Sequence, residues 1–204
     1  MARVAIITGG TRGIGRAIAE RLHGAGYTVA ATFAGNDEAA QRFTEATGIA
    51  HFKWDVCDFD ACQDGAAAVE AALGPVDILV NNAGITRDGT VKRMSHEDWD
   101  AVIQTNLGSC FNMCKAVFPG MCDRGFGRIV NIGSINGQAG QYGQVNYAAA
   151  KSGIHGFTKA LAQEGARYGV TVNAIAPGYI DTEMVAAVPE KVLEKIVARI
   201  PVGR

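Results

Sequence analysis

The 204-residue sequence lacks an excess of charge of either sign, because its 19 lysines and arginines are matched by 20 aspartates and glutamates. Without a basic cluster the chain cannot neutralise a phosphate backbone, so we expect no nucleic-acid partner. Charged residues make up only 19% and hydrophobic residues 48%, a balance that excludes an intrinsically disordered chain. The sequence also lacks a Gly-X-Y or heptad period, which excludes a fibrous protein.

Long hydrophobic runs and paired cysteines are missing as well. No apolar stretch reaches the length of about 18 residues that spans a bilayer, and no secretory cleavage site follows the amino-terminal MARVAII. The five cysteines show no C-x-x-C pair, and Cys110 and Cys114 have no further ligand at metal-binding spacing. We therefore expect a cytoplasmic protein with reduced cysteines, no membrane association and no metal.

Short, nearly continuous apolar runs alternate with longer stretches of helical period, as in a sheet whose strands are buried on both faces. The predicted strands are Arg3–Ile7, Tyr27–Phe33, Ile49–Trp54, Val76–Val80, Arg128–Ile132 and Val170–Ile175. The predicted helices are Ile14–Gly24, Asp37–Thr47, Asp58–Ala72, His96–Cys122 with a break near Asn106, and Tyr147–Tyr168. This alternation predicts right-handed crossovers and an α/β fold, as a single domain over residues 1–204.

Glycine is abundant, at 26 of 204 residues, and a glycine-rich turn follows the first predicted strand. The turn, Thr8-Gly9-Gly10-Thr11-Arg12-Gly13-Ile14-Gly15, leads directly into a helix. Glycines let a backbone approach a pyrophosphate, whose charge is held by free N–H groups at the helix start. Because the glycine spacing differs from the G-x-G-x-x-G fingerprint, the turn by itself leaves a dinucleotide site and a plain turn open as alternatives.

The end of the second predicted strand distinguishes the two nicotinamide dinucleotides. An NAD site usually has Asp or Glu there to bind the ribose 2′-hydroxyl. Phe33-Ala34-Gly35-Asn36 offers no acid before Asp37 and Glu38, which are typical first-turn residues of the next helix. Arg12 supplies a cation within the glycine-rich turn. These features favour a 2′-phosphate and hence NADP, with a merely solvated Arg12 as the alternative.

Three residues with acid–base chemistry follow the fifth predicted strand. Ser134 comes directly after that strand, and Tyr147 and Lys151 follow it in the chain. Tyr147 and Lys151 are four residues apart and share one helix face, where an ammonium favours a tyrosinate and lowers the phenol pKa. A tyrosine with a lowered pKa is a usable general acid at neutral pH. A packed Tyr beside a solvated Lys is the plain alternative, which the conjunction with Ser134 and the glycine-rich turn disfavours.

These motifs, together with Asn81-Asn82-Ala83-Gly84, Asn106 and Pro177-Gly178, resemble the motif set of the short-chain dehydrogenases/reductases, in order and along essentially the whole chain. The resemblance implies an α/β fold with a single Rossmann-type, doubly wound parallel sheet and helices on both faces. It also implies that the chain is an NADP-dependent oxidoreductase.

The resemblance implies a role for each catalytic residue. Tyr147 would protonate the substrate carbonyl oxygen while hydride arrives from the nicotinamide, and Ser134 would hydrogen-bond that oxygen. Lys151 would hold the nicotinamide ribose and lower the Tyr147 pKa, and Asn106 would bind a water that connects Lys151 to solvent. Physically, this is general acid catalysis combined with stabilisation of developing alkoxide charge.

The same resemblance implies where NADP(H) and the substrate would bind. The implied cofactor residues are Gly9, Thr11, Arg12, Gly13, Ile14, Gly15, Asp55, Val56, Asn82, Ala83, Gly84, Tyr147, Lys151, Pro177, Gly178, Tyr179 and Ile180. Within the family, segments 82–88, 136–147 and 177–180 resemble the acetoacetyl-CoA reductases of polyhydroxyalkanoate synthesis, which implies reduction of acetoacetyl-CoA to 3-hydroxybutyryl-CoA. The implied substrate residues are Asp88, Ser134, Gln141, Tyr142, Gln144, Tyr147 and Tyr179.

The chief alternative is a 3-oxoacyl-[acyl-carrier-protein] reductase. A carrier protein needs a basic docking face, and two positions where we expect Arg hold Gly125 and Tyr168, although Arg124 and Arg167 stand one place earlier. This difference favours CoA. A second alternative is a non-catalytic, nucleotide-sensing regulator of the same fold, but such proteins commonly lose a catalytic residue, and all the catalytic positions are filled here.

The resemblance also implies an assembly. Residues Leu107–Cys122 and Tyr147–Tyr168 resemble helices that pair across a two-fold axis in the family, so we expect a homotetramer. Family members continue beyond Pro201–Arg204 through another helix and strand. We therefore expect the sequence as given to lack the family's last helix and strand.

Overall fold

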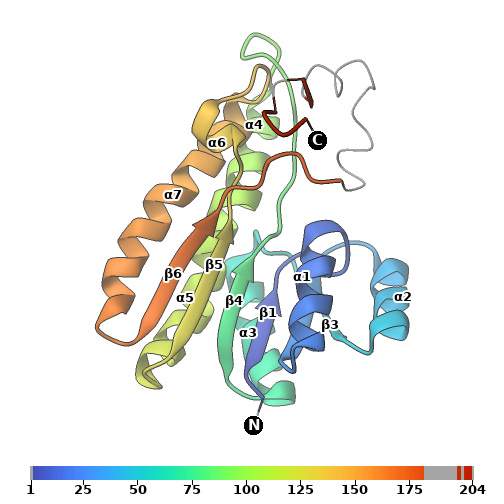
Figure 1. Cartoon of the computed structure of the whole chain (residues 1–204), viewed down its shortest axis with the longest axis vertical. Coiled ribbons are helices and arrows are strands. Elements are labelled where there is room, and N and C mark those ends of the chain that lie inside the picture. The colour runs from blue at the N-terminus through green and yellow to red at the C-terminus, as the bar shows by residue number, and fades with distance from the viewer. Residues whose placement is uncertain (1, 182–196, 199, 204) are drawn as a thin grey trace.

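Six parallel strands form one sheet in the computed structural model, which describes residues 2–181, 197–198 and 200–203. The strands are β1 Val4–Ile7, β2 Thr28–Phe33, β3 Ala50–Lys53, β4 Val76–Asn81, β5 Gly127–Ile132 and β6 Val170–Ile175. Their order in the sheet is β3-β2-β1-β4-β5-β6 (Figure 1). This is the doubly wound Rossmann order, and each of the six predicted strands is confirmed.

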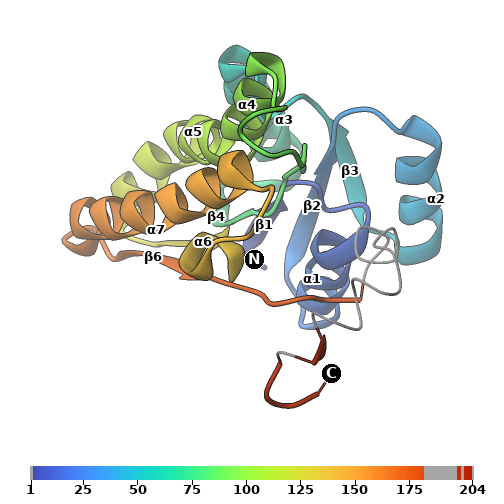
Figure 2. The ribbon, with the colours of Figure 1, turned by 90° about the horizontal axis from the view of Figure 1, so that it is seen from above.

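Helices cover both faces of the sheet, as predicted. They are α1 Gly13–Gly24, α2 Asp37–Thr47, α3 Phe59–Leu73, α4 His96–Ile103, the π-helical turn η1 Gln104–Gly108, α5 Ser109–Asp123, α6 Asn136–Ala139 and α7 Val145–Ala166. Figure 2 shows α3, α5 and α7 on one side of the sheet and α1 on the other. In the described part of the chain, no helix combines the length and the apolar character needed to cross a membrane.

Strand β1 shows why the strands are apolar along their whole length. Val4 and Ile6 belong to the core beneath α3, α5 and α7, whereas Ala5 and Ile7 belong to the core beneath α1 and α2. Successive side chains of a strand point to opposite faces, so a strand covered on both sides has no position that favours a polar residue. The apolar run in the sequence therefore reflects burial between two layers of helices.

Short-range capping sets where several helices begin. The side chain of Asn36 accepts a hydrogen bond of 2.9 Å from the backbone N–H of Ala39 at the start of α2. Asp37 and Glu38 consequently occupy the first turn of that helix, as predicted, where a negative charge is favourable to the helix dipole. Ser95 caps α4 in the same way, through a 3.0 Å bond from the N–H of Asp98.

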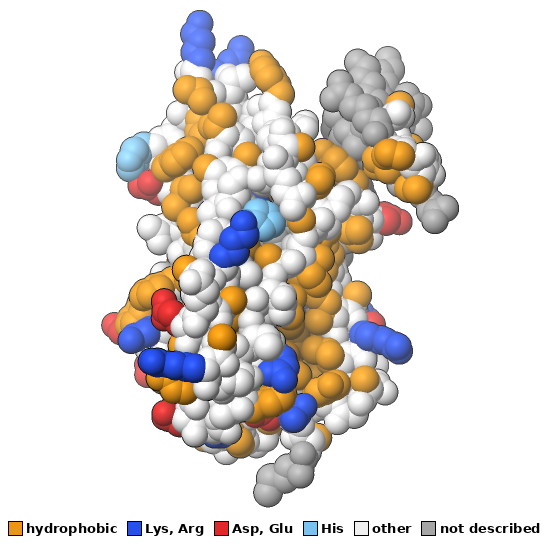
Figure 3. Space-filling view, turned by 60° about the vertical axis from the view of Figure 1, so that its left-hand side comes forward, with side chains coloured by type: hydrophobic (Ala, Val, Ile, Leu, Met, Phe, Trp, Pro, Cys, Tyr) orange, Lys and Arg blue, Asp and Glu red, His pale blue; other side chains and the backbone are white. Residues whose placement is uncertain are grey.

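Charged side chains are dispersed over one face of the molecule. Figure 3 shows lysine and arginine side chains spread from the top to the bottom of the face that it draws, among apolar and neutral ones.

The sheet has its topological reversal between β1 and β4, which pair with each other at its centre. Ligands of open α/β sheets bind at the carboxyl ends of the strands beside such a reversal, so a site is expected at the loops that follow β1 and β4.

Candidate active site

The loops that follow β1 and β4 are hydrogen-bonded to each other. Thr8 Oγ1 accepts bonds from the backbone N–H groups of Asn82, at 2.9 Å, and Ala83, at 3.0 Å. The side-chain amide of Asn82 donates back to the carbonyl oxygen of Thr8 at 2.9 Å. Hydrogen bonds therefore join the glycine-rich turn to residues 82–84, and the family resemblance assigned both to one cofactor.

Three glycines of the turn occupy positions that do not accommodate a side chain. Gly9 and Gly13 adopt positive φ angles of 62° and 51°, a backbone conformation that L side chains rarely adopt. At Gly15, an added Cβ would collide with the carbonyl oxygen of Gly9 and lie 2.5 Å from the Asn82 side-chain nitrogen. Helix α1 begins at Gly13, and its N-cap residue, Arg12, makes no side-chain capping bond within the described part of the chain. These features fit a nucleotide pyrophosphate, and Thr11 and Ile14 lie half-buried in the same turn.

The glycine-rich turn carries a cation, and no acid lies between the end of β2 and Asp37. Arg12 is exposed, and among the described residues its guanidinium makes no hydrogen bond or ion pair. The Asp37 carboxylate, the first acid after β2, is bonded to Lys53 Nζ at 2.7 Å. This arrangement is compatible with a 2′-phosphate beside Arg12. Farther along the same edge, Asp55 accepts a bond of 2.9 Å from the backbone N–H of Cys57, and Val56 is buried.

Ser134, Tyr147 and Lys151 come together where β5 ends and α7 begins. Ser134 and Lys151 are buried, with exposed fractions of 8% and 4%. Lys151 Nζ donates to the carbonyl oxygen of Ile132 at 2.6 Å and lies 5.6 Å from the centre of the Tyr147 ring. An ammonium near a phenol and a hydroxyl is the arrangement that the sequence motifs predicted, and the structure adds that this ammonium is buried.

The electrostatics of this cluster differ from the prediction in one respect. The pKa of Tyr147 is raised above its ordinary value, mainly by burial; a hydrogen bond with Ser134 lowers it, and the charges of Asp88 and Tyr179 raise it. The expected net lowering of the Tyr147 pKa is therefore not found in the chain by itself, because desolvation of the phenolate dominates. Burial also lowers the pKa of Lys151 to about 8. Tyr147 is consequently protonated at neutral pH, the state that a proton donor needs.

Asn106 lies in the π-helical turn η1, which confirms the predicted break in the long helix. Its side-chain amide is bonded in both directions to Ile85, accepting from the backbone N–H at 2.8 Å and donating to the carbonyl at 2.9 Å. Gly84 lies against this amide: an added Cβ there would be 2.7 Å from Asn106 Oδ1 and 3.7 Å from Lys151 Nζ. The turn thus brings the buried Asn106 side chain to the loop that also borders Lys151.

Part of the predicted substrate set is brought together. Gln144 donates to Asp88 Oδ2 at 2.9 Å and accepts a bond of the same length from the side chain of Asn136. Tyr179 is half-buried and close enough to Tyr147 to affect its pKa. These residues border the phenol that would meet a substrate.

The remaining predicted residues lie farther out. Tyr142 is 89% exposed, and Gln141 beside it is exposed too, so these two side chains line no enclosed acyl pocket in this structure. After β6, the carbonyl of Pro177 accepts a bond of 3.0 Å from the N–H of Ile135, while Gly178 and Ile180 are exposed. The 177–180 segment therefore joins the loop that carries Ser134.

Comparison with known proteins identifies the family. The short chain dehydrogenase family matches residues 3–193. The chain belongs to this family. An acetoacetyl-CoA reductase of Shinella zoogloeoides is 64% identical to this short-chain dehydrogenase over 205 residues, which cover 100% of this chain and 85% of the relative. One from Rhizobium meliloti (strain 1021) is 65% identical with the same coverage. A 3-oxoacyl-[acyl-carrier-protein] reductase of Escherichia coli (strain K12) is 45% identical, over 99% of this chain and 83% of the relative.

Membership of the family makes this chain an oxidoreductase that uses a nicotinamide cofactor. The cradle described above, with Gly15 too close to Gly9 and Asn82 to bear a side chain, fits that cofactor. The family resemblance predicted from the motifs is therefore confirmed.

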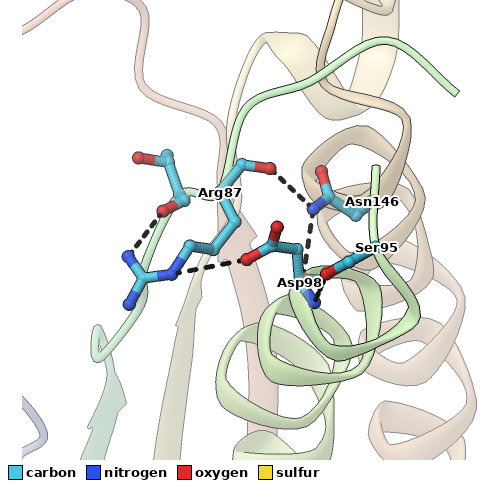
Figure 4. A network of polar contacts seen from close by, with 5 residues as sticks. Arg87, Ser95, Asp98 and Asn146 are labelled. Carbon is cyan, nitrogen blue, oxygen red and sulfur yellow. Dashed lines mark hydrogen bonds and ion pairs between the residues drawn. The ribbon is translucent and has the colours of Figure 1, made fainter. Parts of the chain in front are cut away.

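Sequence reasoning missed one residue of this short-chain dehydrogenase. Asn146, directly before Tyr147, is fully buried, and its side chain is bonded to the backbone of Tyr147, Arg87 and Asp98. Figure 4 shows the bonds to Arg87 and Asp98. The signal that could have pointed to it is a polar residue in the first turn of a helix, at a position whose neighbours in the chain carry the chemistry. Two of its three partners, Arg87 and Asp98, by contrast, lie 59 and 48 residues away in the sequence.

Proposed function

We propose that this short-chain dehydrogenase reduces the 3-oxo group of acetoacetyl-CoA with NADPH to form 3-hydroxybutyryl-CoA, in polyhydroxybutyrate synthesis. The observation that carries the proposal is the convergence of Ser134, Tyr147 and the buried Lys151 beside a glycine cradle. The names of the relatives at 64% and 65% identity support the choice of substrate.

The cofactor would be held by residues at the carboxyl edge of the sheet. The glycine-rich turn and the first N–H groups of α1 would bind the pyrophosphate, residues 55–56 the adenine, residues 82–84 the ribose, and residues 177–180 the nicotinamide amide. Arg12, which has no partner among the described residues, would bind the 2′-phosphate and select NADPH over NADH. When bound, NADPH supplies the hydride that forms the new C–H bond at the substrate's carbonyl carbon.

The proton is supplied by the chain's own residues. As the carbonyl π bond breaks, its electron pair moves to oxygen, and Tyr147 transfers its phenolic proton there to complete the hydroxyl group. The Ser134 hydroxyl would donate a hydrogen bond to the same oxygen and stabilise its developing charge. Lys151, held by the carbonyl of Ile132, would then stabilise the resulting tyrosinate, and Asn106 would keep the adjoining loop in place.

The carrier-protein alternative is disfavoured by how the candidate docking arginines are used. The guanidinium of Arg124 donates to the carbonyl of Val76 at 2.6 Å and lies 3.9 Å from the Glu70 carboxylate. Arg167 lies over the ring of Tyr168, 4.7 Å from its centre. Arg124 is therefore bonded to its own chain, which weakens the case for a basic face that receives an acidic carrier protein.

The deciding experiment compares kcat/KM for acetoacetyl-CoA and for the acetoacetyl form of the acyl carrier protein, with NADPH consumption followed by absorbance. We expect the CoA thioester to be preferred. A strong preference for the carrier-protein substrate would replace the proposal with the fatty-acid reductase. NADPH binding without turnover of either substrate would indicate the sensing regulator.

Three further predictions remain proposals. We expect the protein to form a homotetramer, to act in the cytoplasm, and to fold as one domain over residues 1–204. Light scattering at micromolar concentration tests the assembly, and a stable monomer would contradict it.

A further inference from the structure

We infer that Asn146 is a positioning residue that holds the proton donor Tyr147 in a fixed place relative to the substrate-side loop. The inference rests on the proposed function for the identity of the reaction, but its geometry is independent of the substrate. Asn146 lies at the second position of α7, directly before Tyr147, and its exposed fraction is 0%.

Every polar atom of the Asn146 side chain is used. Its oxygen accepts a bond of 2.8 Å from the backbone N–H of Tyr147, and its nitrogen donates to the carbonyl oxygens of Arg87, at 2.9 Å, and Asp98, at 3.3 Å. Helix α7 has no side-chain cap at its N-cap residue, Gln144. Asn146 therefore supplies the partner that the first-turn N–H of Tyr147 would otherwise lack.

The two carbonyls belong to segments that are themselves tied together. The Arg87 guanidinium lies 3.8 Å from the Asp98 carboxylate, and the N–H of Asp98 donates to Ser95 Oγ at the start of α4 (Figure 4). Figure 4 shows the Asn146 amide between the Arg87 loop and the first turn of α4. The amide thus closes a ring that joins the loop after β4, helix α4 and helix α7.

This ring connects the proton donor to the substrate side of the site. Arg87 immediately precedes Asp88, whose carboxylate accepts the Gln144 bond described above. Through Asn146, the backbone of Tyr147 is therefore anchored to the segment that carries Asp88. Proton transfer needs the donor within hydrogen-bond reach of the carbonyl oxygen, and a displacement of about 1 Å costs on the order of 10²-fold in rate.

If Asn146 served only to stabilise the fold, its replacement would not change kcat. A matched control variant elsewhere in α7 distinguishes this structural role from a positioning role. Thr158, farther along α7, also accepts a buried amide bond, of 2.9 Å, from Asn131. Thr158→Val removes that bond far from Tyr147, whereas Asn146→Ala removes the three bonds beside it. If buried amide bonds in α7 serve stability alone, both variants lower the melting temperature and leave kcat unchanged.

Kinetics with acetoacetyl-CoA and NADPH form the first test. We expect Asn146→Ala to lower kcat by roughly 10- to 100-fold, with the KM for NADPH changed by less than about twofold because the glycine-rich turn is untouched. Thr158→Val should keep the parental kcat. A kcat for Asn146→Ala equal to that of Thr158→Val would overturn the inference.

Asn146→Asp provides a second variant should the alanine variant not fold. Its carboxylate still accepts from the Tyr147 N–H but cannot donate to the carbonyls of Arg87 and Asp98, while its protonated form can. The charged groups of the residues that it contacts are the Arg87 guanidinium and the Asp98 carboxylate, which lie 3.8 Å apart, and Asp88 follows Arg87 in the chain. We expect kcat relative to the parent to rise as pH falls from about 8 to about 6. A ratio that is constant with pH contradicts the donor role.

A measurement without turnover separates failure of this inference from failure of the proposed function. With tyrosine labelled with ¹³C at Cζ, NMR titration reports the Tyr147 phenol, assigned through its loss in Tyr147→Phe. Asn146→Ala should shift this signal and move the phenol pKa toward its ordinary value, while Thr158→Val leaves both unchanged. An unmoved signal refutes the inference even if acetoacetyl-CoA is reduced, and a moved signal supports it even if another substrate is used.

Discussion

Replacing Lys151 by methionine should abolish activity and yet stabilise the cofactor-free protein at neutral pH. Lys151 is 4% exposed, and burial lowers the pKa of its ammonium to about 8 from 10.5. At about 1.4 kcal/mol per pKa unit, keeping this group charged in the folded state at pH 7 costs roughly 3 kcal/mol. Methionine removes that cost and fills similar volume.

The substitution also removes a favourable contact. The carbonyl of Ile132 loses the 2.6 Å bond from Lys151 Nζ, and leaving a buried acceptor unpaired costs about 1–3 kcal/mol. We therefore expect Lys151→Met to be more stable than the parent by roughly 0–2 kcal/mol at pH 7.

The pH dependence of the unfolding free energy tests whether the depressed pKa of Lys151 causes the difference in stability. Because the folded pKa lies below the unfolded one, the unfolded chain binds more protons between about pH 8 and about pH 10.5, so parental stability rises with pH across that window. The stability of the variant relative to the parent should therefore fall by roughly 2 kcal/mol between pH 7 and about pH 9.5. Urea denaturation of both proteins at these two pH values measures it. Equal pH dependence in parent and variant would refute the reasoning that Lys151 is buried with a depressed pKa.

Four further substitutions test the site. Arg12→Ala should weaken NADPH binding by one to two decades, roughly, and NADH binding far less, since only NADPH carries the 2′-phosphate; equal weakening in fluorescence titrations would contradict the assignment. Tyr147→Phe removes only the proton donor, so kcat should fall by at least about 10²-fold while NADPH still binds, and retained turnover would exclude the mechanism. Gln144→Ala or Tyr179→Ala should lower kcat/KM for acetoacetyl-CoA by roughly one to two decades with NADPH affinity nearly unchanged; parental rates in both would remove these residues from the substrate site.

The hydrogen bonds of Gln144 give a second reason why Gln144→Ala should lower kcat/KM for acetoacetyl-CoA. Its side chain joins Asn136 to Asp88 through two bonds of 2.9 Å. Truncating it therefore frees a carboxylate at the edge of the site as well as removing a substrate contact. Asp88→Asn, which keeps an acceptor for Gln144 without the charge, is the matched control for this effect.

The strands and the position of the site could be predicted from the sequence alone. An apolar run such as Val4–Ile7 is buried whichever helices cover it, and Asn36 caps a helix through an N–H only three residues away. The glycine-rich turn and the Tyr147–Lys151 pair are likewise local patterns, and helical or strand geometry alone sets how their members lie. These features depend on residues that are close together in the sequence, so the sequence alone predicts them.

The energetics of the site were decided only by the tertiary structure. The pKa of Tyr147 rises because burial outweighs the effects of neighbouring groups, and the amount of burial depends on loops from elsewhere in the chain. Asn146 reaches backbone partners that are 59 and 48 residues away, and Tyr142 points to solvent despite its place in the substrate-side loop. Desolvation and hydrogen bonding act through space, so residue type and spacing determined which groups are present, while packing between distant segments determined their charge state and orientation.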